Sequence, residues 1–182
     1  MKRGIMSVEE YESDRGIYTI VFNNVRFDSR YHKIIEGILR VFVGEGESFL
    51  GFYRTDGVNM TPKQWNESQK NIRSYFNLYE NLKDQNNYLA VAKLNLNGDA
   101  YRILPLVFDY YLETILFKPQ LDWKVFKQFH CEYMLHSSKE YITRGYTNFL
   151  FTYFDSGDCS ICFNSQKYKP KVVKDMISKF RR

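Results

Sequence analysis

The chain has 182 residues, of which 44% are hydrophobic and 18% aromatic, and its formal net charge is +5. So many aromatic side chains, with only four prolines, exclude a disordered chain. A chain of this length buries roughly 70% of its extended surface without help from a metal or a disulfide. We therefore expect a single domain over residues 1–182, or two lobes that divide near residues 84–87.

The three cysteines cannot pair completely, which favours free thiols in a reducing cytoplasm. Residues 1–20 contain no apolar segment typical of a signal peptide. No apolar run approaches the ~18 residues that a membrane span needs. The sequence therefore predicts a cytoplasmic protein without a membrane partner.

The first third of the chain predicts two strands that flank a helix. Residues 16–22 are rich in β-formers, and the Asn23-Asn24 turn is expected to return the chain through residues 25–27, which gives a hairpin over about 16–27. Residues 1–14 are expected to be loose, or to form a short helix over 8–11. Asp28 or Ser29 is expected to cap a helix that ends before Gly44–Glu47, because its apolar residues recur at i, i+3, i+4 and i+7. A second strand is expected over residues 48–54.

The middle of the chain predicts helices on either side of a second hairpin. Thr61-Pro62 is a capping residue followed by a first-turn proline, which predicts a helix to about Lys83. Asn97-Gly98 between two β-like runs predicts a hairpin over about 88–104, because both turn positions favour positive φ. Residues 106–117 suit a helix or a buried strand, and we favour the helix. Asp122 is expected to begin a helix that reaches about Tyr141.

The last third predicts the hairpin that organises the sheet, over residues 147–164. Phe149, Phe151 and Tyr153 share one face of its first strand, whereas Leu150, Thr152 and Phe154 share the other. A strand that is apolar on both faces is expected at the centre of a sheet. Asp155 to Asp158 supplies the turn. A final helix is expected over residues 170–180, and the whole pattern predicts an α+β fold of antiparallel hairpins with four to five helices.

The cysteines and histidines do not predict a metal or catalytic centre. Cys159 and Cys162 are three positions apart on a strand, so their thiols are expected to point to opposite faces, and no second pair with this spacing exists. His130 falls near the apolar stripe of its helix and is interpreted as a core histidine bonded to a neighbour. Adjacent helical residues diverge by about 100°, so Cys131 is not expected to face it.

The remaining motifs also point away from chemistry. Asp155 and Asp158 bracket a turn, which explains both carboxylates without a bound ion. The sequence contains no phosphate-binding loop, no dinucleotide fingerprint and no nucleophile elbow. We therefore predict a protein that is not an enzyme, with no cofactor, no catalytic residue and no metal ligand.

The positive charge is concentrated at residues 167–182, which we expect to form a basic C-terminal helix or tail. Seven basic residues and one acid give this segment a charge of +6, so the rest of the chain is near −1. Phosphate-backbone contact and a solvated helix face are both consistent with such a segment. Tyr168 lies between two lysines and could stack on a base. The predicted partner-binding residues are Lys167, Tyr168, Lys169, Lys171, Lys174, Lys179, Arg181 and Arg182, together with Tyr53 and Arg54 as a candidate aromatic contact.

The small size and the composition rich in Lys, Asn and Tyr resemble the small inhibitors encoded by phages and mobile elements, such as type II-A anti-CRISPR proteins. The resemblance implies a non-enzymatic inhibitor in the cytoplasm of a bacterial host that binds an RNA-guided nuclease or its guide RNA. Inhibitors that mimic DNA are acidic, whereas this chain is basic, so contact with RNA or DNA through residues 167–182 is expected instead.

Two alternatives stay open. The segment TNFLFTYFDSGDCSICF, residues 147–163, is similar to the β-hairpin with which some small bacterial toxin-immunity proteins end, which would imply a one-to-one complex with a toxin. A nucleic-acid-binding protein or nuclease is the other alternative.

Overall fold

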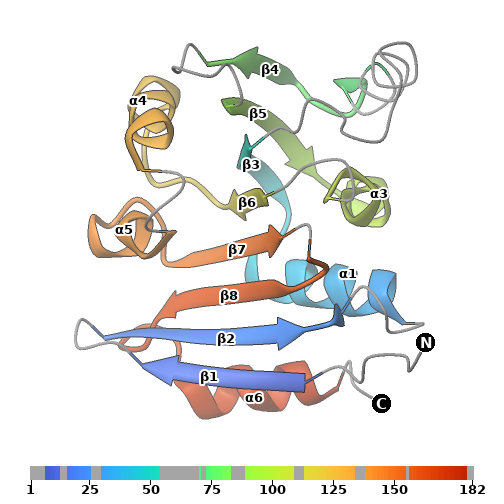
Figure 1. The fold of residues 1–182 in the computed structure, drawn as a ribbon, viewed down its shortest axis with the longest axis vertical. Helices are drawn as coiled ribbons and strands as arrows, with labels where there is room; N and C mark the ends of the chain where they lie inside the picture. The colour runs from blue at the N-terminus through green and yellow to red at the C-terminus, as the bar shows by residue number, and fades with distance from the viewer. Residues whose placement is uncertain are drawn as a thin grey trace.

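A computed structural model shows one eight-stranded antiparallel sheet flanked by helices, an α+β fold as expected (Figure 1). The structure describes residues 7–12, 16–25, 30–53, 70, 73–82, 89–108, 113–133, 138–154 and 156–179. Within these ranges the strands are β1 (Ser7–Glu12), β2 (Ile17–Asn23), β3 (Gly46–Tyr53), β4 (Leu78–Asn81), β5 (Leu89–Leu96), β6 (Glu113–Phe117), β7 (Phe149–Phe154) and β8 (Cys159–Asn164). Their order in the sheet is β1-β2-β8-β7-β6-β3-β5-β4.

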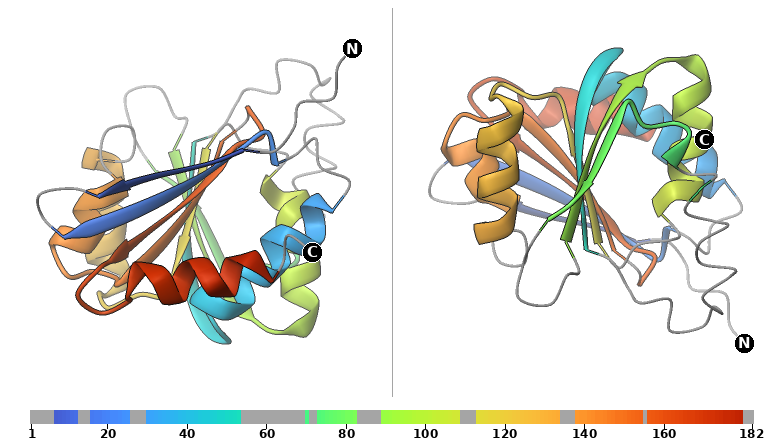
Figure 2. Two further views of the ribbon diagram at one scale, coloured as in Figure 1. Left: turned by 90° about the horizontal axis from the view of Figure 1, so that it is seen from below. Right: turned by 90° about the horizontal axis from the view of Figure 1, so that it is seen from above.

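The helices cover both faces of the sheet. They are α1 (Tyr31–Phe42), α3 (Gly98–Phe108), α4 (Trp123–Tyr133), α5 (Ser138–Thr143) and α6 (Pro170–Ser178). Figure 2 shows α1, α3 and α6 on one face, called here the α1 face, and α4 and α5 on the other, the α4 face. Each face has its own hydrophobic core, so the sheet is the middle of three layers.

The β7–β8 hairpin lies inside the sheet, as predicted. Phe151 and Ile161 belong to the core of the α1 face, whereas Leu150 and Cys162 belong to that of the α4 face. Burial on both faces explains why this strand pair is apolar at nearly every position. Gly157 makes the turn with a φ of 86°, a conformation that favours glycine.

The hairpin predicted over residues 16–27 is wrong, because β2 pairs with other strands. β2 pairs with β1 on one side and with β8 on the other, and Val25 lies in a short turn after β2. The expectation of a loose segment or helix over 8–11 is therefore also wrong. β1 has no apolar alternation of its own, and all six of its residues pair with β2.

The predicted Asn97-Gly98 hairpin is also wrong, because these residues begin α3. The Asn97 side-chain oxygen accepts hydrogen bonds from the backbone N–H groups of Asp99 and Ala100, which is helix capping. β5, which precedes it, is confirmed. The helix favoured over 106–117 is wrong as well, because α3 ends at Phe108 and β6 is a buried strand.

Other boundaries agree in part. α1 is confirmed, and Gly44 ends it with a φ of 70°. The proposed caps Asp28 and Ser29, and the helix start at Thr61-Pro62, lie outside the described residues. That helix does not extend to Lys83, because β4 occupies 78–81. Asp122 caps α4 as predicted, through a hydrogen bond that its Oδ1 accepts from Val125 N–H.

Candidate partner-binding surface

The final helix α6 is anchored to the α1 face by two side chains one turn apart. Pro170 occupies its first turn, where a missing N–H group costs nothing. Val173 and Ile177 are buried in the core beneath it. Just before the helix, Tyr168 packs edge-to-face on Phe163, with ring centroids 6.2 Å apart. The predicted base-stacking residue Tyr168 is thus half-buried.

Lys174 ties α6 to the edge of the sheet. Its ammonium group forms an ion pair with Glu10 on β1 and lies 5.5 Å from the ring centroid of Tyr18 on β2. The Tyr18 hydroxyl donates a second hydrogen bond to Glu10, 2.6 Å long. The hydrogen bonds from Lys174 and then Tyr18 lower the pKa of Glu10 below its ordinary value, and the bond to Glu10 raises the pKa of Lys174. Lys174 therefore holds α6 against the edge of the sheet.

The other predicted lysines of this region point to solvent. Lys167, Lys169, Lys171 and Lys179 are exposed, and none of them makes an ion pair with the residues that the structure describes. α1 packs between α6 and α3, and it adds the exposed Lys33, while α3 adds Arg102. We call these six cations, Lys33, Arg102, Lys167, Lys169, Lys171 and Lys179, the basic helical face.

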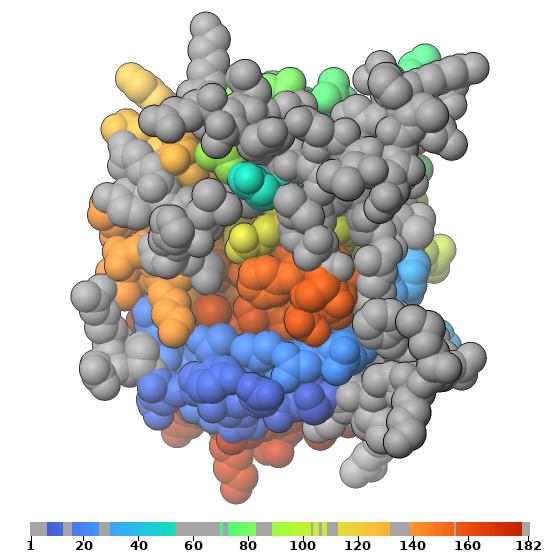
Figure 3. Space-filling model, viewed as in Figure 1, coloured from blue at the N-terminus to red at the C-terminus, as the bar shows by residue number. Residues whose placement is uncertain are grey.

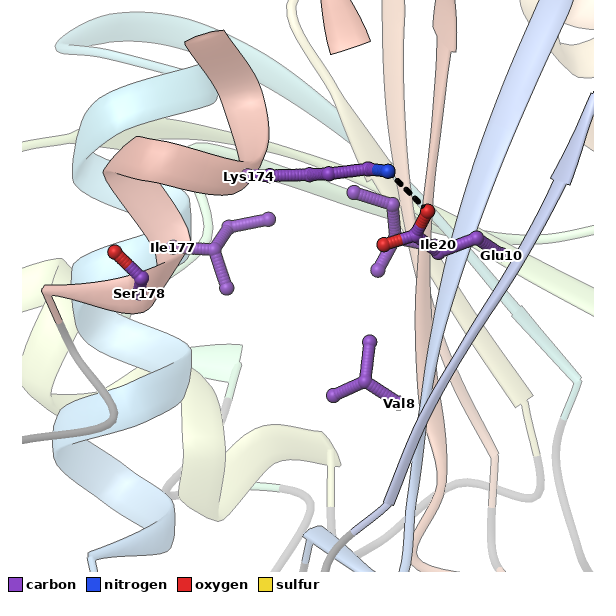
Figure 4. A pocket seen from close by; sticks show the side chains of 6 residues that line it. All are labelled: Val8, Glu10, Ile20, Lys174, Ile177 and Ser178. Carbon is purple, nitrogen blue, oxygen red and sulfur yellow. Dashed lines mark ion pairs between the residues drawn. The ribbon is translucent and has the colours of Figure 1, made fainter. Parts of the chain in front are cut away.

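A small hollow separates α6 from the β1–β2 edge (Figure 4). Its volume is about 50 Å³, and it is lined by Val8, Glu10, Ile20, Lys174, Ile177 and Ser178. The three aliphatic side chains converge on its interior, and the Lys174–Glu10 pair crosses it on one side. The hollow can accept an aliphatic side chain next to a polar rim.

The predicted site residues do not form one surface. Tyr53 is half-buried against the core of the α4 face, on the opposite side of the sheet from the lysines of α6. Arg54, Arg181 and Arg182 lie outside the described residues. The aromatic contact proposed around Tyr53 is therefore separate from the basic helical face.

His130 is a core histidine, as predicted. Its side chain is fully buried against Gly51 of β3, and its Nδ1 lies 3.1 Å from the Tyr141 hydroxyl of α5. Burial lowers the pKa of His130 to about 3, so the ring is neutral near pH 7. The close approach to Gly51 escaped sequence reasoning because the two residues are 79 positions apart in the chain.

Glu113 is a titratable group that the sequence did not indicate. It begins β6 on the α4 face, directly opposite Tyr53 of β3 and Phe154 of β7. Burial raises its pKa to about 7. Burial also raises the pKa of Tyr141, and the charges of Cys131 and Glu113 raise it further. Had residues 113–117 been predicted as a buried strand, the Glu113 carboxyl would have been expected between neighbouring strands, where Tyr53 and Phe154 lie.

The two thiols of β8 lie on opposite faces of the sheet, as expected. Cys159 is buried on the α1 face and Cys162 on the α4 face, and burial raises the pKa of the Cys159 thiol. Asp158 accepts one hydrogen bond from the Ser156 hydroxyl within the turn and another from the Asn24 N–H group, just after β2. Asp155 lies outside the described residues. No group of three or more His, Cys, Asp or Glu side chains within the described ranges is placed to hold a metal ion.

Comparisons with protein-family models, with curated proteins and with solved structures find no match for this chain. Among the helices that the structure describes, none is both long and apolar enough to cross a lipid bilayer.

Proposed function

We propose that this protein is a non-catalytic inhibitor that binds the phosphate backbone of a nucleoprotein, as an anti-CRISPR protein would bind the guide RNA of an RNA-guided nuclease. The observation that carries the proposal is the basic helical face, whose exposed cations lie on helices that pack on the sheet or directly beside them. Cations without an internal partner are available to displace counterions from phosphates, the main source of affinity in such complexes.

The geometry of α6 favours a phosphate backbone as the ligand. Lys171 and Lys179 are eight residues apart, so their Cα atoms are separated by about 12 Å along the helix axis. Asp175 lies between them on the same side of the helix and reduces the local potential. Lys33 and Arg102 extend the cationic surface across the neighbouring helices.

The experiment is a salt titration of binding to a fluorescent 20-base-pair duplex. Replacement of Lys171 and Lys179 by Ala should lower the log–log salt slope by about two units, since each phosphate contact contributes about 0.9. The matched control replaces Lys124 and Lys139, exposed lysines of α4 and α5, and should leave the slope unchanged. Equal slopes for the two double variants would contradict the proposal.

Retention of the protein on a guide-loaded RNA-guided nuclease tests the inhibitor part. Wild-type protein should co-purify with the loaded complex, and the Lys171→Ala/Lys179→Ala variant should be retained less. If neither the loaded nor the empty nuclease retains the wild-type protein, this class of target is wrong.

A further inference from the structure

The sheet has an open edge at β1. In the described part of the chain β1 pairs with β2 alone, and its backbone groups on the other side have no strand beside them. Figure 3 shows β1 at the lower border of the molecule, with atoms of α6 beneath it. Such an edge can accept another strand through main-chain hydrogen bonds.

The hollow beside α6 lies where an added strand would place alternate side chains. Val8 and Glu10 point to the α1 face, because Val8 packs against that core and Glu10 meets Lys174. A residue paired with Val8 on an added strand would project to the same face, next to Ile177 and Ser178. Edge pairing combined with a side-chain pocket is the arrangement by which β-augmentation selects a sequence.

The charges of the edge identify the occupant. Glu9, Glu10 and Glu12 are three of the six residues of β1, whereas β2 carries no charged residue. Lys174 pairs with Glu10, whereas Glu9 accepts hydrogen bonds from the Tyr11 hydroxyl and the Asn23 side-chain amide but stays exposed to solvent, as does Glu12. A second copy of this chain would bring like charges together at the edge, which is destabilising.

We propose that β1 binds an extended basic segment of a partner protein by β-augmentation, with an aliphatic side chain in the hollow beside Val8 and a lysine or arginine next to it paired with Glu9. This inference goes beyond the proposed function, since its ligand is a peptide without phosphate.

The probe is a labelled ten-residue peptide of alternating lysine and valine, added to the full-length protein. It should bind, and the β1 amides at residues 7–12 should exchange hydrogen more slowly in its presence. Glu9→Lys should weaken binding at least tenfold because the charge is reversed. Ser178→Phe should weaken it at least fivefold, because a ring at the rim of the hollow would occupy the aliphatic position.

Two controls separate these effects from misfolding. Glu45→Lys reverses an exposed carboxylate beyond α1, and Gln120→Phe adds a ring on an exposed loop beyond β6; both should bind the peptide like wild type. Each variant is used only if its thermal unfolding midpoint matches that of its control.

Three results would overturn the proposal. The first is equal peptide affinity of Glu9→Lys and Glu45→Lys. The second is unchanged exchange of the β1 amides at saturating peptide. The third is a dimer of the wild-type protein that protects the same amides without peptide, which would assign the edge to a second copy.

Discussion

The imidazole ring of His130 lies so close to the backbone of Gly51 that a Cβ atom at position 51 would fall 2.1 Å from the Cε1 atom of His130. β3 therefore needs glycine here for the space that the ring occupies, and not for an unusual φ. The contact fixes the distance between α4 and the sheet at this point.

Gly51→Ala is expected to destabilise the protein by about 3 kcal/mol, because the buried ring has to shift within a packed core. Urea unfolding measures the change. Gly98→Ala is the matched control: a Cβ atom there meets nothing within 4 Å, and alanine at a helix start should be neutral or stabilise by about 0.5 kcal/mol. The double variant Gly51→Ala/His130→Ala should lose at least about 1 kcal/mol less than the sum of the single losses. Strictly additive losses would contradict the steric account.

The pKa of Glu113 predicts an unusual dependence of stability on pH. The folded protein keeps the Glu113 proton up to pH about 7, whereas the unfolded chain releases it near the ordinary value of 4.5. The free energy of unfolding should therefore fall as pH rises through this window. Glu113→Gln should be more stable than wild type at pH 8 by about 1–2 kcal/mol, a value reduced for partial exposure to solvent. Urea unfolding at pH 5 and pH 8 checks this.

His130 opposes Glu113 in the same pH range. Its folded pKa of about 3 lies below its ordinary value of 6.5, so the unfolded chain binds the extra proton and stability rises with pH between these values. In the Glu113→Gln variant this rise should be visible up to about pH 6.5. A Glu113→Gln profile parallel to that of wild type would show that Glu113 does not titrate as described.

The Glu10–Lys174 pair predicts a pH-dependent docking of α6. The folded pKa of Glu10 is lowered, so its contribution is present above pH 4.5 and is lost as pH falls through the folded pKa. The protection factors of the α6 amides, which account for the slower intrinsic exchange at low pH, should fall below this point. Lys174→Met should return the NMR titration of Glu10 towards its ordinary midpoint, whereas Lys171→Met should not change it. Identical Glu10 titrations in the two variants would exclude Lys174 as the cause.

The Asn97 cap predicts a further stability change. Asn97→Ala removes the acceptor of two backbone N–H groups and should cost about 1 kcal/mol, whereas Asn97→Asp should cost little. Thermal unfolding compares the two variants. Equal losses would mean that the side-chain oxygen does not stabilise α3.

The sequence predicted the elements whose patterns depend on neighbours in the chain. The alternation of β7 and β8 specified two covered faces, and the spacing of α1 and α6 specified their buried stripes. The burial of His130 followed from its place on the apolar stripe of α4. Each of these patterns is read from a single element and its period.

The errors arose where one local signal suits two structures. Asn97-Gly98 fits a hairpin turn and also a helix cap. The helix forms because Tyr101, Leu104 and Phe108 have helical spacing, which buries them on the α1 face. In β6 the continuous apolar run Ile115–Phe117 suits a helix until its neighbours β3 and β7 are known. The hollow beside α6 and the contact of His130 with Gly51 depend on residues far apart in the chain, so no local pattern could reveal them.

The pairing of β2 with β8 has a consequence for how the chain acquires its structure. Ile20 lies opposite Ile161, so the two strands close a loop of about 140 residues, one of the slowest kinds of contact to form. During synthesis at about 5–20 residues per second, the apolar strand β2 would wait roughly 7–28 s for the 141 residues from Asn24 to Asn164. While these residues are being synthesised, nascent chains therefore expose the edge of β2 that later pairs with β8, and efficient folding in the cell should depend on chaperones that cover this edge.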